Sequence, residues 1–399
     1  MKKHLLFVID SLICAGGEKS LITLLNILDY NKYEVDLQLF TFGGDFEIYI
    51  PKEVNLLPPL PITPFVNETL VHNILHTTDL DSVKMLKARI RYSYLLRKEK
   101  NLKHAGTARL YWESMSGCIP TSSKEYDCAI AYAQCIPTFY VVDKVKAKKK
   151  MGWVNCIFHL EGREKEFQSE YYRQLDHIVC VSQASFNHLS KVYPDYAQQM
   201  TIVKDIVDAS FINKLADYPC KITKNPEIPT LLTVARLNKE MKGFDIALEA
   251  CKILKERNFK FKWYVLGKGP YKEEMQQFIA ANNLENNFIL LGTDANPYPY
   301  YRQSSLYVQT SRHEGFGLSI AEARLLNIPV VTTEFDAVYA QMVPNKNGLV
   351  VPLDPSKVAD AIEKVLTDTQ LYTSIVAYLK QEKKGNTEEL QKVYNLLDN

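Results

Sequence analysis

The sequence predicts an α/β protein of two Rossmann-like domains that face each other across a cleft. Short, continuously apolar runs such as HLLFVI (4–9) alternate with segments of helical periodicity, as in sheets of buried parallel strands. This alternation occurs in two series, and the stretch DYPCKITKNPEIP (217–229) between them has three prolines and no apolar period. A chain of 399 residues has room for two such domains.

The first series predicts strands at 4–9, 35–42, 127–132, 151–154, 177–182 and 201–204. After the first strand, Leu21, Leu24, Leu25 and Leu28 follow helical spacing and give one apolar face. We therefore expect an N-terminal domain over residues 1–208.

The second series predicts strands at 230–236, 262–267, 287–292, 305–310 and 329–333. Helical patterns separate or follow them at 244–257, 271–283, 318–327 and 356–367. We expect a hinge linker over 209–228, a C-terminal domain over 229–368, and a polar helix or tail over 369–399.

Charge and cysteine content exclude several classes of protein. The net charge of +2 gives no global attraction to nucleic acid. The eight cysteines form no CxxC pair, so we expect reduced thiols, no disulfide framework and no metal site. Asp10 interrupts the apolar N-terminal run too early for a signal peptide, and no run approaches the length of a membrane span. These features predict a cytoplasmic protein.

One segment departs from this neutral balance. Residues 82–109 contain nine lysines and arginines against one acid, Glu99, and Val83, Leu86, Ile90 and Tyr94 follow helical spacing. A basic amphipathic helix suits an anionic membrane at its inner face, or an acidic acceptor. The alternative is a helix that packs on its own domain and exposes a basic side. The residues that would form the membrane or acceptor surface are Lys84, Lys87, Arg91, Arg97 and Lys98.

The stretch SRHEGFGLSIAEARLL follows a predicted strand and opens a predicted helix. Ligands of open parallel sheets bind beyond the carboxyl ends of the strands, which is where this corner would lie. Gly315 and Gly317 allow a tight turn, and the first turn of the helix offers N–H groups to a phosphate. Glu314 and Glu322 are candidates for gripping sugar and ribose hydroxyls; alternatively, they only cap or decorate the helix.

Basic residues follow the strand 230–236 at the same predicted edge. Arg236 offers a bidentate fork and Lys242 a point charge, a pair suited to a diphosphate leaving group. A second glycine corner, Gly16 and Gly17, opens the first helix of the N-terminal domain. The LGKGP stretch lacks the third glycine and downstream acid of a dinucleotide site, so it does not indicate NAD.

Together, ARLNKEMKG, LGKGP, the ILLG strand, HEGFGLSIAEA, PNKNGLVVP and the N-terminal SLICAGGEKS resemble the retaining glycosyltransferases of family 4, which have the GT-B architecture. The likeness covers nearly the whole chain and is strongest over 230–352. It implies that Glu314 contacts the donor sugar and Glu322 the ribose. Arg236, Lys242 and the N–H groups of Gly317 and Leu318 would hold the diphosphate, and Gly16 and Gly17 would approach the donor phosphates or the acceptor.

The chain departs from this family at one position. Many relatives have a histidine after a WV-type strand, facing the donor sugar, but here MGWVNCIFH places Asn155 there. His159 follows four residues later and is the alternative active-site residue.

The resemblance implies transfer of a sugar, with retention, from a nucleoside diphosphate to a glycan or lipid-linked acceptor in surface polysaccharide synthesis. UDP is the first expectation for the nucleotide and GDP the second, with neither a metal nor a cofactor. Two alternatives stay open at this point: a non-catalytic homologue that binds a partner or glycan, which the Asn155 departure motivates, and a sugar-nucleotide epimerase of the same architecture.

Overall fold

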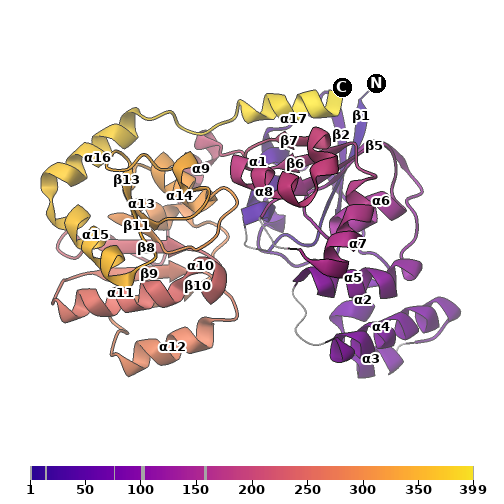
Figure 1. Cartoon of the computed structure of the whole chain (residues 1–399), viewed down its shortest axis with the longest axis horizontal. Helices are drawn as coiled ribbons and strands as arrows, with labels where there is room; N and C mark the ends of the chain where they lie inside the picture. The colour runs from indigo at the N-terminus through magenta and orange to yellow at the C-terminus, as the bar shows by residue number, and fades with distance from the viewer. Residues whose placement is uncertain (1, 14–15, 76, 100–103, 157–159, 399) are drawn as a thin grey trace. The chain divides into compact units, whose positions relative to one another are not determined.

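The structure, a computed structural model, describes residues 2–13, 16–75, 77–99, 104–156 and 160–398. The chain divides into two compact units. The N-terminal unit contains residues up to Ile13, then Gly17–Val203 and the segment from Gln391 onward. The C-terminal unit contains Lys204–Leu390 and, by its contacts, Gly16. Figure 1 shows most of the first unit in indigo to magenta, with its part of the C-terminal helix in yellow, and most of the second unit in salmon to yellow.

The N-terminal unit is built on a seven-stranded sheet with the order β3-β2-β1-β4-β5-β6-β7. Each neighbouring pair is parallel, and β1 aligns Leu5 with Val35 of β2 on one side and Cys128 of β4 on the other. The strands are β1 (Lys3–Ile9), β2 (Tyr33–Leu39), β3 (Val54–Leu56), β4 (Glu125–Ala131), β5 (Lys146–Val154), β6 (His177–Cys180) and β7 (Met200–Ile202).

The helices of this unit connect successive strands, as a parallel sheet requires. They are α1 (Gly16–Ile27), α2 (Thr63–Asn67), α3 (Leu70–Leu75), α4 (Leu80–Lys98), α5 (His104–Met115), α6 (Ile136–Lys144), α7 (Gly162–Tyr172) and α8 (Gln183–Val192). The core lies between helices and sheet, where Phe139 packs against Trp112 and Tyr171. Helix α17 (Glu389–Asp398) also packs here: Lys3 Nζ donates to Leu397 O at 3.0 Å, beside β1 (Figure 1).

The C-terminal unit has a six-stranded parallel sheet with the order β10-β9-β8-β11-β12-β13. The strands are β8 (Thr230–Val234), β9 (Lys262–Leu266), β10 (Phe288–Gly292), β11 (Leu306–Gln309), β12 (Val330–Thr333) and β13 (Gly348–Val351). The chain order reverses between β8 and β11, which makes the carboxyl end of these two strands the topological switch point of the sheet.

Eight helices of the described chain cover this sheet or flank it. They are α9 (Ala209–Ala216), α10 (Lys239–Lys242), α11 (Phe244–Glu256), α12 (Lys272–Ala281), α13 (Tyr298–Arg302), α14 (Leu318–Leu325), α15 (Pro355–Thr367) and α16 (Thr369–Gln381). The core contains Trp263 and Phe288, whose ring centroids are 5.2 Å apart.

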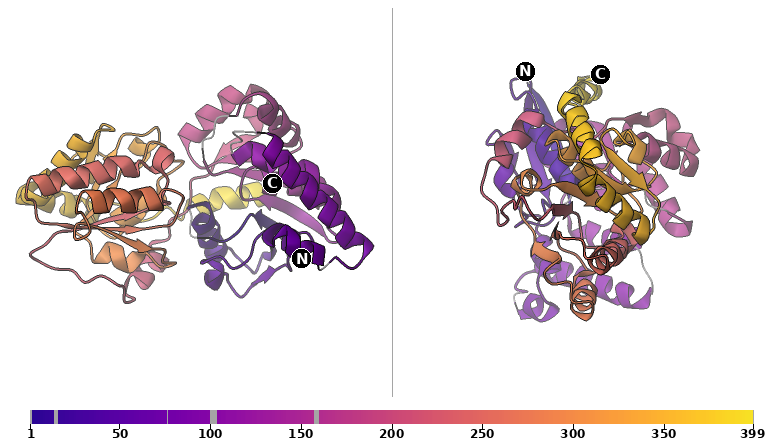
Figure 2. Two further views of the ribbon diagram at one scale, coloured as in Figure 1. Left: turned by 90° about the horizontal axis from the view of Figure 1, so that it is seen from below. Right: turned by 90° about the vertical axis from the view of Figure 1, so that its left-hand side faces the viewer.

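The two parallel sheets with covering helices confirm the predicted α/β class with two Rossmann-like domains. The details differ in two places. Part of the segment expected as a linker, 209–216, is helix α9, and the polar C-terminal segment forms two helices, α16 and α17. The views of Figure 2 show helices on both sides of each sheet.

Candidate functional site

The candidate site lies at the switch point of the C-terminal sheet, where β8 and β11 end. The loop after β8 contains Arg236 and leads into α10, and the corner after β11 contains Glu314 and leads into α14. Two hydrogen bonds tie these loops together: Thr310 Oγ1 donates to Lys242 O at 3.1 Å, and Arg312 N donates to Met241 O at 2.9 Å. Backbone contacts thus hold the two predicted site loops side by side.

Glu314 accepts three hydrogen bonds at one carboxylate oxygen. Lys242 Nζ lies 2.6 Å from Oε1, Ser311 Oγ 2.7 Å and Gln309 Nε2 2.9 Å. The other oxygen, Oε2, has no hydrogen-bond partner among the described residues. The Glu314 side chain is 13% exposed, so the three donors fix its orientation and leave Oε2 as an acceptor for a ligand.

Gln309 connects Glu314 to the interior of the unit. Its side chain is buried at the end of β11, and its Oε1 accepts a hydrogen bond from Tyr307 Oη at 2.9 Å. Sequence reasoning missed both Gln309 and Ser311. The only signal was their position, five and three residues before the glutamate, on the strand and turn that lead into the glycine corner.

The two cationic side chains of this site differ in their contacts. Lys242 ends helix α10 and forms an ion pair with Glu314. Arg236 is exposed, two residues beyond β8, and its side chain forms no hydrogen bond or ion pair with any described residue. The structure therefore brings Lys242 and Glu314 into contact and leaves the Arg236 guanidinium available to a ligand.

Gly317 is the N-cap of α14 and has φ +85°, a left-handed conformation that side chains other than glycine rarely adopt. Leu318, the first helical residue, is partly exposed. Ser319 Oγ donates to Val234 O at 3.0 Å, which holds the first turn of α14 beside the end of β8. The helix N-terminus and the loop of Arg236 thus lie at one edge, as the motif spacing predicts.

Glu322 is placed differently from Glu314. It is 1% exposed and accepts hydrogen bonds from Tyr298 Oη and Tyr301 Oη, both at 3.3 Å. Both tyrosines come from α13 and were missed by sequence reasoning. The structure does not bring this carboxylate to the surface, and its contact with a ribose stays a prediction.

The glycines of LGKGP serve backbone packing. A Cβ on Gly267 would lie 1.9 Å from Ala235 O, and one on Gly269 would lie 2.2 Å from Leu237 O. Leu237 N also donates to Lys268 O at 3.0 Å. These glycines let the loop after β9 support the loop of Arg236, which explains the GxG pattern without a dinucleotide.

In the N-terminal unit, Gly17 and Asn155 meet. A Cβ on Gly17 would lie 2.9 Å from Asn155 Nδ2, which donates to Tyr132 O at 2.6 Å. Because that carbonyl can only accept, the amide orientation is fixed, and Asn155 Oδ1 is buried without a hydrogen-bond partner among the described residues. Gly16 begins α1 just before this contact. His159, the alternative to Asn155, lies outside the described residues.

A carboxyl group with an unusual pKa lies at the end of β1. Burial, and secondarily the charge of Glu18, raises the pKa of Asp10 to about 7. Groups with displaced pKa values gather at functional sites, although structural causes also produce them.

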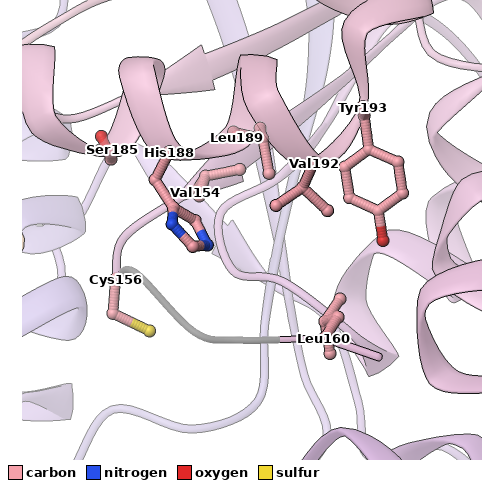
Figure 3. A pocket seen from close by; sticks show the side chains of 8 residues that line it. All are labelled: Val154, Cys156, Leu160, Ser185, His188, Leu189, Val192 and Tyr193. Atoms are coloured by element: carbon pink, nitrogen blue, oxygen red, sulfur yellow. The ribbon is translucent and has the colours of Figure 1, made fainter. Parts of the chain in front are cut away.

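A recess of about 280 Å³, open solvent included, lies elsewhere in the N-terminal unit, under α8. Figure 3 shows the side chains of His188, Leu189 and Val192 projecting from that helix toward it. The lining residues are Val154, Cys156, Leu160, Ser185, His188, Leu189, Val192 and Tyr193. Its lining is mainly apolar, and it contains none of the charged residues expected to bind a donor.

The basic segment differs from the expectation in two respects. It forms two helices, α4 and α5, and Arg109 on α5 is buried among Glu99, Glu113 and Glu164 rather than exposed. Ile90 and Tyr94, expected on an apolar face, are exposed. Lys84, Lys87, Arg91, Arg97 and Lys98 are all exposed on α4.

The described residues contain no group of three or more histidines, cysteines, aspartates or glutamates arranged to hold a metal ion. None of their helices is both long enough and apolar enough to cross a bilayer.

Two parallel-sheet domains with a cationic and glycine-rich corner at the C-terminal switch point define the GT-B architecture. Residues 217–382 match the family model described as "Glycosyl transferases group 1". The matched residues lie within the C-terminal unit.

Curated glycosyltransferases are similar in sequence to part of this chain. The chain is 26% identical over 192 residues to the 2-deoxystreptamine N-acetyl-D-glucosaminyltransferase of Niallia circulans, covering 47% of this chain and 49% of that one. It is 30% identical over 128 residues to the poly(ribitol-phosphate) alpha-N-acetylglucosaminyltransferase of Staphylococcus aureus, covering 31% and 25%. Half or less of each relative's length is thus spanned.

A solved structure shares the whole fold. A mutant of S. aureus TarM, in complex with Fondaparinux, alpha-GlcNAc-glycerol and UDP, superposes with a TM-score of 0.70 at 13% sequence identity. The match covers 100% of both chains. At this identity the likeness concerns the fold.

Proposed function

We propose that this protein is a glycosyltransferase that moves a sugar from a nucleoside diphosphate, UDP in the first place, to a glycan or lipid-linked acceptor in surface polysaccharide synthesis. The observation that carries the proposal is the Glu314 carboxylate, held by Lys242, Ser311 and Gln309 with one oxygen left to accept. It stands at the same sheet edge as the unpaired Arg236 and the start of α14. The family match over 217–382 supports it.

Each group has a distinct part in the proposed reaction. Arg236 and Lys242 stabilise the diphosphate as negative charge develops on the leaving group. The N–H groups of Gly317 and Leu318 at the start of α14 add to this field. Glu314 Oε2 accepts a hydrogen bond from a donor-sugar hydroxyl and orients the anomeric carbon. Glu322 is assigned the ribose, which requires the side chains that cover it to move.

We propose that the reaction proceeds with retention and without a metal or cofactor. Fixed cations at the diphosphate take the charge-neutralising part that a divalent ion would otherwise have. A mutant of TarM, which shares the fold, binds alpha-GlcNAc-glycerol together with UDP, and this is compatible with transfer from a UDP-sugar with an α linkage in this chain. The finer assignment of Asn155, whose Oδ1 lacks a partner, is to a hydroxyl of the sugar or acceptor.

The first test is thermal stabilisation by UDP, GDP and ADP in the absence of metal. A ligand that binds only the folded state at 100 times its Kd adds about 2.7 kcal/mol of stability. We expect one nucleotide to raise the Tm of the wild-type protein. The same nucleotide should not raise the Tm of the Arg236→Ala variant. Arg97→Ala is the matched control, because Arg97 is also an exposed arginine without a partner among the described residues.

A second measurement separates transfer from its alternatives. Incubation with the donor sugar alone, followed by NMR, would show epimerisation as a changed sugar still attached to its nucleotide. A transferase releases free nucleotide in step with glycosylation of an acceptor. No Tm shift with any nucleotide, from a well-folded sample, would replace the proposal with that of a non-catalytic homologue.

A further inference from the structure

One face of helix α4 is exposed and basic. Its exposed positions 84, 87, 91, 94 and 98 follow helical spacing of three and four, so they share a face. Four of the five are Lys84, Lys87, Arg91 and Lys98, and the fifth is Tyr94. The views of Figure 1 and Figure 2 place α4 at the periphery of the N-terminal unit.

Few acidic side chains lie close enough to neutralise these cations. Asp81 is the only acid within α4, and it pairs with Lys84 at 3.1 Å. The side chains of Lys87, Arg91 and Lys98 form no ion pair or hydrogen bond with any described residue. The face therefore keeps at least three uncompensated positive charges.

The neighbouring helix α3 exposes three of its four apolar side chains. Its polar residue Asn73 is buried and donates to Phe65 O at 2.8 Å. Its apolar residues Val71, Ile74 and Leu75 are 67%, 57% and 74% exposed. An outward apolar face on a soluble protein marks an interaction site.

Exposed apolar side chains are concentrated in this region. Twelve large apolar side chains of the described chain are exposed, and six of them lie between residues 71 and 94. Beyond the three on α3, they are Leu80, Ile90 and Tyr94. Helix α3 packs on α4, as Figure 1 also shows, so both features belong to one part of the molecule.

We propose that α3 and α4 form a surface that docks on a membrane containing anionic lipids. The lysines and arginine contact the lipid phosphates, and the outward apolar side chains enter the interfacial layer. This surface needs no catalytic step, so it goes beyond the proposed function and can fail without affecting it.

Two other occupants fit less well. A soluble polyanion would use the cations but gain nothing from Val71, Ile74 and Leu75. A symmetric dimer through this face would bring α4 of one copy close to that of its partner, and the uncompensated charges would repel. Only an anionic bilayer offers both phosphate groups and an apolar layer.

The test is co-sedimentation of the full chain with vesicles. One set contains phosphatidylcholine alone, and the other an equal mixture of phosphatidylcholine and phosphatidylglycerol. We expect binding to the mixed vesicles that weakens as salt is added, because screening acts on exposed charges. The triple variant Lys87→Glu, Arg91→Glu, Lys98→Glu should lower the partition coefficient at least ~100-fold.

Two further variants complete the design. Val71→Ser, Ile74→Ser, Leu75→Ser should lower binding about tenfold or more at low salt, since the apolar contribution is then absent. The matched control Lys214→Glu, Lys272→Glu, Lys364→Glu reverses three exposed lysines of the C-terminal unit and should bind like wild type. An unchanged Tm without ligand and an unchanged far-UV circular dichroism spectrum show that all variants remain folded.

Three results would overturn the proposal. These are no binding of wild type to the mixed vesicles, wild-type binding by the charge variant, or full binding by the apolar variant together with complete displacement by soluble polyphosphate. The last result would assign the surface to an anionic polymer.

Discussion

Replacing Gln309 by leucine removes one of the three donors that orient Glu314 while preserving the approximate volume of the side chain. Gln309 is buried, donates to Glu314 Oε1 at 2.9 Å and accepts from Tyr307 Oη at 2.9 Å. A hydrogen bond to a charged group contributes about 1.5–3 kcal/mol. If that orientation is needed only when the sugar binds, kcat/KM should fall roughly 10- to 100-fold, since 1.36 kcal/mol is tenfold.

Gln309→Leu should also lower the free energy of unfolding, for a reason that does not involve Glu314. Tyr307 Oη keeps a weak bond to Val234 O at 3.4 Å but loses its better acceptor, so we expect a loss of about 2–3 kcal/mol. For a unit of this size that corresponds to a Tm lower by roughly 5–10 °C. Gln38→Leu is the control, because Gln38 is also buried and donates to Leu39 O at 2.8 Å, but in the N-terminal unit.

The decisive assay compares affinity for UDP with affinity for the UDP-sugar by calorimetry. Gln309→Leu should leave UDP binding unchanged and reduce the additional affinity that the sugar provides. The control should change neither. Equal losses for UDP and UDP-sugar, or no loss for either in a folded variant, would refute the argument that Gln309 orients Glu314 toward the sugar.

Three other predictions concern the same two units. Gly317→Ala should cost about 1–2 kcal/mol of stability, seen as a lower Tm, because φ there is +85°, whereas Gly117→Ala, with nothing within 4 Å of the added Cβ, should not. Glu322→Ala should lower Tm more than Glu322→Gln, which keeps an acceptor for the two buried tyrosine hydroxyls; equal effects would show that those bonds contribute little. Burial, and then Glu18, raises the pKa of Asp10 from 3.8 to about 7, so the folded state retains a proton that the unfolded chain releases. Its stabilising contribution is complete below pH 3.8 and is lost as the pH rises to about 7. Asp10→Asn should therefore flatten the decline of Tm between about pH 4 and 7, and an unchanged profile would contradict this.

The buried parallel strands were predictable because their apolar runs are continuous. Strand β5 was harder: it begins at Lys146, whereas the sequence indicated a start near 151, because KAKKK reads as polar. In the structure those lysines have specific partners, such as Lys148 with Asp127 at 2.8 Å and Lys149 with Leu396 O at 2.9 Å. The local pattern of apolar residues does not predict contacts with residues so far away in the sequence. The three-residue strand β3 is too short to give a pattern.

The candidate site was also predictable only in part. Motif spacing indicated that the loops of Lys242 and Glu314 lie at one sheet edge, and the structure places the two side chains 2.6 Å apart. It did not indicate that α13, about twenty residues earlier in the sequence than Glu322, would cover that glutamate with two tyrosines. Helical periodicity gives the faces of a helix but not its neighbour, so burial at this position needed the tertiary structure.

Helix α17 has a consequence for how the chain folds during synthesis. Tyr394 stacks on Tyr33 with ring centroids 5.8 Å apart, and Asp398 accepts a hydrogen bond from Tyr33 at 3.1 Å. These residues of the N-terminal unit are translated only after the whole of the C-terminal unit. The N-terminal unit therefore lacks this packing partner for β1 and β2 until the C-terminal unit has been synthesised, and its surface around Tyr33 is open to chaperones throughout that interval.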